Sequence, residues 1–100
     1  MTALEMARHY RIAIEFADLG DWGAAELRAE YDPEGPVIRI NTRAIARVAE
    51  VRGEAFVATA IGHEIYHHRE RIGELPRLRD AVAREAAADA FGRELSAAKR

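Results

Sequence analysis

The first apolar residues of the chain recur every three to four positions, which is typical of an amphipathic helix. They are Met6, Tyr10, Ala13, Ile14 and Ala17. Thr2 is a candidate N-cap, and Glu5 three residues later completes the pattern of a capping box. Gly20 is a plausible stop for such a helix. We therefore predict a first helix that reaches about Leu19.

The spacing between apolar residues then shortens to two positions. Apolar and charged side chains alternate over residues 25–31, which is typical of a strand with one face in water. Residues 32–35 read Asp-Pro-Glu-Gly and form a turn signal, and residues 36–41 read as a second strand. This order predicts a β-hairpin, with Trp22 as a packing anchor in the loop that precedes it.

Three helices are predicted in the remainder of the chain. Asn41 or Thr42 would cap the first of them. Gly53 and Gly73 would separate the three, and Pro76 fits the first turn of the last. Their expected spans are 42–51, 54–71 and 76–98. The order of elements predicts one domain over residues 1–100, with a mainly helical α+β fold and a small β-hairpin beside the helix 54–71.

Composition narrows the classes of function. A net charge of −2 with 32% charged residues gives no electrostatic basis for binding nucleic acid. The chain has no cysteine, so a metal site would have to use His, Asp and Glu. The N-terminus does not read as a signal peptide, and no apolar stretch approaches membrane-spanning length. We therefore expect no membrane partner and a cytoplasmic location.

The predicted helix 54–71 carries a His-Glu-x-x-His motif. His63 and His67 lie one helical turn apart, so both imidazoles can reach one metal ion. Glu64 is offset by about 100° and is placed to reach a metal-bound water as a general base. A five-residue match can also arise by chance on a solvated helix in a chain with four His. The preceding stretch 55–62 is nearly all apolar or small, which indicates a buried helix whose polar groups need partners.

Helix geometry points to a third ligand. If the last two helices pack antiparallel about a turn near Glu74, then Glu85 faces His63 and is the expected third ligand of a catalytic zinc. Asp89, one turn further on, would approach the distal nitrogen of His63 and orient the ring. The plainer interpretation is a solvated pair of carboxylates. Apolar residues surround both carboxylates over 81–91, which is unusual for a solvated face.

The two segments together resemble the gluzincin metallopeptidases, in particular the minigluzincins and the peptidase domains of the ImmA/IrrE type. The resemblance rests on His63, Glu64 and His67, followed by Glu85, Ala88, Asp89 and Phe91. In that pattern the Glu before x-x-x-Asp is the third zinc ligand and the Asp supports the first His, which match Glu85 and Asp89. The likeness implies zinc-dependent peptide hydrolysis, with the peptide extended along a strand edge. The strand Val37–Asn41 is our candidate for that edge.

The leading hypothesis is a zinc-dependent endopeptidase that acts on peptides or unfolded protein. Zn²⁺ held by His63, His67 and Glu85 would activate a water, and Glu64 would take its proton. The alternative is a latent or regulatory zinc-binding protein of the same fold. Its cleft would be covered by its own terminus or by a second copy, because the hairpin edge invites a homodimer. A third hypothesis, a helical interaction module without metal, requires these residues to coincide by accident.

The residue that would polarise the substrate carbonyl stays open on the sequence alone. The candidates are His9, Tyr31, Tyr66 and His68. His68 adjoins a ligand but points about 100° away from His67 in a helix, so we expect it at the surface or in a supporting position. Gly62 costs about 1 kcal/mol relative to Ala inside a helix. Close approach of another helix, or access for a substrate, would account for it, and the plainer alternative is a tolerated defect.

Overall fold

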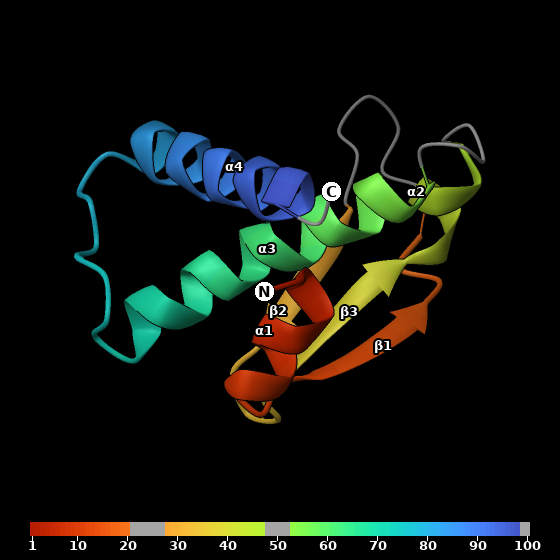
Figure 1. The fold of residues 1–100 in the computed structure, drawn as a ribbon, viewed down its shortest axis with the longest axis horizontal. Helices are drawn as coiled ribbons and strands as arrows, with labels where there is room; N and C mark the ends of the chain where they lie inside the picture. Colours follow the sequence, from red (N-terminus) through yellow and green to blue (C-terminus); the bar gives the residue numbers. More distant parts are fainter. Residues whose placement is uncertain (21–27, 48–52, 99–100) are drawn as a thin grey trace.

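A long central helix separates a small sheet from a second long helix. The computed structural model describes residues 1–20, 28–47 and 53–98. In chain order the elements are α1 (Ala3–His9), β1 (Ala13–Ala17), β2 (Ala29–Asp32), β3 (Val37–Asn41), α2 (Thr42–Ala46), α3 (Gly53–Arg71) and α4 (Ala81–Ala98). Figure 1 shows α4 along one side of α3 and the strands on the other, with α1 packed against α3. This segregation of helices and strands confirms the predicted α+β class.

The first helix begins as predicted but is shorter. Thr2 and Glu5 form the expected capping box, in which each side chain accepts a hydrogen bond from the backbone N–H of the other. The helix α1 then ends at His9 instead of near Leu19. The strand β1 follows it, so the prediction of one continuous helix is wrong.

A backbone motif at Arg11 explains the early end of α1. Arg11 has a φ of 57°, in the left-handed region through which a helix cannot continue. Its N–H donates to the Arg8 carbonyl at 3.0 Å, and the Ile12 N–H donates to the Ala7 carbonyl at 2.8 Å, which is the Schellman pattern. Ile12 and Ala7 are both buried, so the turn also closes an apolar contact. Because glycine is the usual residue at this position, the pattern of the sequence pointed instead to Gly20.

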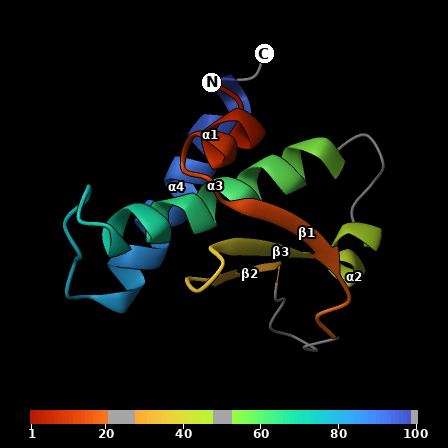
Figure 2. The same cartoon turned by 90° about the horizontal axis from the view of Figure 1, so that it is seen from below.

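The strand β3 lies in the centre of the sheet, between β1 and β2, as Figure 2 shows. The strands β2 and β3 form the predicted antiparallel hairpin, with Ala29 opposite Ile40. The strand β1 pairs parallel with β3, with Ala13 opposite Val37. The expectation that Val37–Asn41 offers a free edge is therefore wrong, because this strand is hydrogen-bonded on both sides. In the described part of the chain, β1 and β2 form the edges.

Asn41 joins the end of the sheet to α2. Its Oδ1 accepts a hydrogen bond from the Arg43 N–H at 3.2 Å, which makes it the N-cap expected at this position. The buried side chain also accepts from the Leu19 N–H and donates to the Gly20 carbonyl, both at 3.1 Å. The helix α2 ends at Ala46, with Arg47 as its C-cap, so the prediction of a helix that continues to Val51 is wrong. The predictions for Trp22 and for residues 25–27 lie outside the described residues.

The two long helices occur where they were predicted, except at the start of the last one. The helix α3 spans Gly53–Arg71, close to the expected 54–71. The helix α4 begins at Ala81 instead of Pro76, because Asp80 caps it by accepting a hydrogen bond from the Val82 N–H at 3.0 Å. No helix within the described ranges is both long and apolar enough to cross a bilayer.

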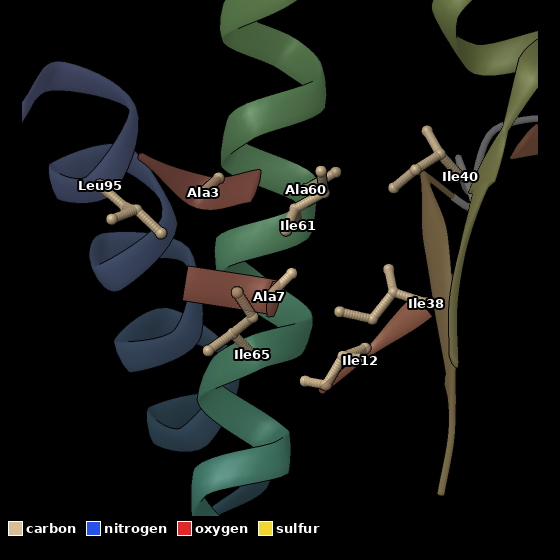
Figure 3. Close-up of a cluster of buried hydrophobic side chains, with 9 residues drawn as sticks. All are labelled: Ala3, Ala7, Ile12, Ile38, Ile40, Ala60, Ile61, Ile65 and Leu95. Carbon is tan, nitrogen blue, oxygen red and sulfur yellow. The ribbon is translucent and has the colours of Figure 1, made fainter. Parts of the chain in front are cut away.

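The hydrophobic core fills the space between α1, α3 and the sheet. Its largest fully buried side chains are Ile38, Ile40, Ile61 and Ile65. In Figure 3 the two isoleucines of β3 face α3, and Leu95 of α4 lies on the opposite side of that helix. Burial of one such side chain stabilises the fold by about 1.5–3 kcal/mol. The core therefore fixes α3 on the sheet and leaves its other face for α4.

Two glycines face each other where α3 and α4 cross. A Cβ on Gly62 would lie 2.7 Å from the Gly92 Cα, and a Cβ on Gly92 would lie 2.3 Å from the Thr59 carbonyl oxygen. Both contacts are too short for real atoms, so a side chain at either position would push the helices apart. Close approach of a second helix, one of the explanations considered for Gly62, is thereby confirmed.

Candidate metal centre

Two imidazoles and one carboxylate converge between α3 and α4. Nε2 of His63 lies 3.2 Å from Nε2 of His67. The Glu85 carboxylate reaches both rings, with 2.8 Å from Oε2 to His63 Nε2 and 3.4 Å from Oε1 to His67 Nε2. Ligand atoms of the three residues all lie within 4.8 Å of one another. The structure thus brings together the three residues predicted as metal ligands.

The arrangement of the two helices accounts for this convergence. His63 and His67 share one face of α3, a single turn apart. The helix α4 runs antiparallel beside α3, as Figure 1 shows, and the crossing at Gly62 and Gly92 keeps the two backbones close. Glu85 faces His63 as the predicted pairing requires, even though α4 starts later than expected.

A carboxylate holds each imidazole at its other nitrogen. The Nδ1–H of His63 donates to Asp89 Oδ1 at 2.7 Å, which confirms the predicted contact between these two residues. The Nδ1–H of His67 donates to Glu70 Oε1 at 2.8 Å. An ionised carboxylate can only accept, so these contacts place the proton on Nδ1. In a neutral ring of this tautomer, Nε2 carries the lone pair and is directed into the cluster.

The contact of Glu70 with His67 was not predicted from the sequence. Its side chain is only 3% exposed, and Arg84 of α4 holds it with Nε 3.1 Å from Oε2 and Nη2 2.9 Å from Oε1. The hydrogen bonds from Arg84, and to a lesser extent from His67, hold the pKa of Glu70 at about 2 despite the opposing effect of burial. The signal available was the spacing His67-x-x-Glu70, because residues three apart are neighbours on a helix.

Glu64, the predicted general base, lies beside the cluster in a partly buried position. Burial raises the pKa of its carboxyl group, against the opposing charges of His63 and His67, and the nearby charge of Glu85 raises it further. A carboxyl group with a raised pKa takes up a proton more readily than one with the ordinary value.

Arg28 brings a positive charge to the same place. It directly precedes β2, and its Nη2 donates to Asp89 Oδ1 at 3.2 Å. Burial acts to raise the pKa of Asp89, but the hydrogen bond from His63 and the charge of Arg28 lower it overall. No local signal distinguished Arg28 among 15 basic residues, because its position depends on how β2 and α4 each pack against α3.

The spacing of the donor atoms fits a small metal ion. A tetrahedral zinc centre with bonds of about 2.0–2.1 Å places its ligand atoms about 3.3 Å apart. The donor separations of 2.8, 3.2 and 3.4 Å lie around this value. With the ring protons on Nδ1, the two Nε2 lone pairs and the Glu85 carboxylate face one another, an arrangement that a bound cation would stabilise. Imidazole and carboxylate ligands are well suited to zinc, and they also bind cobalt, nickel or manganese.

The residues considered for carbonyl polarisation are dispersed. Tyr31 and His68 contact each other, with 2.6 Å between Tyr31 Oη and His68 Nδ1. His68 is buried instead of lying at the surface, and it supports β2 from α3 without joining the donor cluster. His9 is exposed at the end of α1. Tyr66 adjoins the cluster, with its ring centroid 5.9 Å from that of His67.

Comparison with known proteins adds no family assignment to this geometry. Searches against protein-family models, curated proteins and solved structures found no match to the chain. The likeness to gluzincins therefore stays a prediction from the motif residues.

Proposed function

We propose that the protein is a zinc-dependent endopeptidase with a minimal, mainly helical zincin fold of the gluzincin type, acting in the cytoplasm. The observation that supports this function is the convergence of His63, His67 and Glu85 from two helices, with Glu64 beside them. Within the described residues, this is the one group of three His or carboxylate donors within reach of a single ion. The donor set leaves room for a water, as catalytic zinc sites require.

The proposed mechanism assigns a role to each residue. His63, His67 and Glu85 hold the ion, and Asp89 keeps His63 in the tautomer that binds it. When bound, zinc would supply Lewis-acid activation and stabilise negative charge on the carbonyl oxygen. Glu64 accepts the proton of the attacking water and passes it to the leaving amine. Its raised pKa favours the protonated form between these two transfers.

The substrate would pair with β2 instead of the originally expected β3. Arg28, directly before β2, contacts Asp89, so this edge begins beside the cluster. The Arg28 carbonyl accepts the Asn41 N–H at 2.9 Å, and alternate residues of an antiparallel ladder face away from the partner strand. Ala29 and Tyr31 therefore direct their backbone groups outward. An extended peptide paired with them would run past the proposed zinc ligands.

The variant Glu64→Gln tests the assignment of the base. It should keep zinc at the wild-type stoichiometry, because Glu64 is not a ligand, and lose hydrolysis of an unfolded protein by at least about 100-fold. Elemental analysis measures the first quantity and gel-based cleavage the second. The control is Glu94→Gln on the exposed face of α4, which should change neither. Full cleavage by Glu64→Gln would contradict the role of Glu64.

The same experiment separates the other hypotheses. Wild-type protein that holds one zinc but cleaves nothing would support a latent or regulatory protein. The described C-terminal residues do not cover the cluster, because α4 continues along α3 and the Ser96 hydroxyl contacts the Ala55 carbonyl at 3.5 Å. Occlusion by a second copy, paired through the edge of β2 that no described strand covers, would appear as a dimer in light scattering. Wild-type protein without zinc would support an interaction module.

A further inference from the structure

Glu70 and Arg84 connect a proposed metal ligand to the opposite helix. Glu70 lies three residues after His67 on α3, and its Oε1 accepts the Nδ1–H of that ring at 2.8 Å. Arg84 on α4 binds both oxygens of the same carboxylate, at 3.1 and 2.9 Å. With the Glu70 side chain only 3% exposed, water competes little for these contacts. His67, Glu70 and Arg84 thus form a continuous hydrogen-bonded chain between the helices.

The place of Arg84 extends this chain to another ligand. Arg84 directly precedes Glu85, and Asp89, which contacts His63, follows one turn later. A two-bond contact between a guanidinium and a carboxylate restricts rotation as well as distance. The turn of α4 that carries Glu85 is therefore tied to α3 on both sides, by Arg84 before it and by Asp89 after it.

We propose that Glu70 and Arg84 are positioning residues of the metal centre. Glu70 holds His67 as the Nδ1–H tautomer, with Nε2 directed at Glu85, and Arg84 acts through Glu70. This inference rests on the proposed function only in that the cluster binds a metal ion, and it does not depend on peptide hydrolysis. Neither residue is a ligand, because Glu70 contacts the ring nitrogen that faces away from the cluster.

A role in stability alone is the competing explanation. A buried ion pair adds little net stability, since desolvation offsets the attraction between the charges. Removing one partner leaves the other charge buried, so single variants lose stability under either explanation. The test therefore needs two readouts that stability does not move, namely the tautomer of His67 and the zinc affinity of folded protein. The double variant Glu70→Ala with Arg84→Ala removes both charges together.

The first measurement is nitrogen–proton correlation NMR of the metal-free protein at a pH where His67 is neutral. Wild-type protein should show the Nδ1–H tautomer of this ring, because the Glu70 carboxylate accepts that proton. The double variant should shift toward the Nε2–H tautomer. A double variant that keeps the Nδ1–H tautomer would contradict the role of Glu70.

The second measurement is zinc affinity by competition with a chromophoric chelator. Loss of a group that orients a metal-binding histidine typically weakens affinity by about 10–100-fold, and we expect this loss for the double variant. Glu70→Ala alone should lose nearly as much. Adding Arg84→Ala to Glu70→Ala should change affinity by less than about twofold, because Arg84 acts through Glu70. Arg84→Lys, which keeps a charge but not the two-bond contact, should lie between wild type and Glu70→Ala.

The matched control is Glu74→Gln. It removes an ion pair with Arg69, at 3.1 Å, near the same end of α3 without touching a proposed ligand, and it should leave zinc affinity unchanged. Circular dichroism establishes that each variant is folded.

A folded double variant with wild-type zinc affinity would overturn this inference and leave the proposed function intact. Wild-type protein that binds no zinc would overturn both. If the double variant does not fold, wild-type affinity in Arg84→Lys overturns the role of Arg84.

Discussion

Two helices of this protein end with the same backbone motif but with different residues in its left-handed position. After α3, Gly73 has a φ of 83°, its N–H donates to the Glu70 carbonyl, and the Glu74 N–H donates to the Arg69 carbonyl. Arg11 holds the corresponding position after α1 with a φ of 57°. Glycine adopts this conformation without steric cost, whereas a side chain with a Cβ does not. The end of α1 therefore carries a local strain that the end of α3 lacks.

This difference sets an expectation for Arg11→Gly. The substitution should raise the free energy of unfolding by about 0.5–1 kcal/mol, because relief of the left-handed strain exceeds the entropy cost of glycine in the unfolded chain. Chemical denaturation measures the change. Arg8→Gly, at an exposed position inside the same helix, is the control and should lower stability by about 1 kcal/mol. Equal effects of the two variants would contradict the motif at Arg11.

At the scale of elements, the contact between α3 and α4 is made by backbone as well as by side chains. A Cβ on Gly92 would meet the Thr59 carbonyl at 2.3 Å and the His63 backbone nitrogen at 3.1 Å. These atoms belong to the turn of α3 that carries the first proposed ligand. Backbone atoms cannot move aside as a flexible side chain does. The distance between the helices at the metal centre therefore depends on the absence of a side chain here.

We expect Gly92→Ala to separate the two helices. The free energy of unfolding should fall by about 1–3 kcal/mol, which is the usual cost of overpacking. Zinc affinity should fall with it, because Glu85 moves away from His63. Gly53→Ala is the matched control: its Cβ would have no neighbour within 4 Å, so stability should hold or rise. Wild-type stability and zinc affinity in Gly92→Ala would contradict the close crossing.

For the whole molecule, the attachment of α4 is the feature to which a metal ion would contribute most. The helix α4 contacts the rest of the described chain mainly through α3, and the buried core lies largely on the far side of α3. Leu95 and Ala88 are the buried apolar side chains that α4 contributes. An ion shared by His63, His67 and Glu85 would therefore couple metal binding to the docking of this helix.

Zinc should accordingly stabilise the wild-type protein against heat. At a free zinc concentration of about 100 times the dissociation constant, the gain is about 2.7 kcal/mol, or roughly 10 °C or more in Tm for a domain of this size. Scanning calorimetry with zinc and with a chelator measures the difference. Glu85→Ala should lose most of the gain, whereas Glu94→Gln should keep it. A full shift in Glu85→Ala would exclude Glu85 as a ligand.

Most of the correct predictions concern groups close together in the chain. The capping box of Thr2 and Glu5, the cap at Asn41 and the span of α3 depend on neighbours within one or two helical turns. The same holds for the spacing of His63 and His67. The contact of Glu85 with His63 was also predictable, because two antiparallel helices joined by a short connection have little freedom in their pairing. The roles of these residues in binding zinc and in hydrolysis stay predictions.

The sequence alone thus determined which residues share a helix face, and through them the donor set of the candidate metal centre. Tertiary structure alone decided that residues 13–17 form a strand, because their apolar spacing fits a helix equally well until β3 offers them hydrogen-bond partners. It also decided that β3 is central and β2 is an edge, and it brought Arg84 to Glu70 and Arg28 to Asp89. These contacts join segments far apart in the chain, so no local periodicity or propensity encodes them.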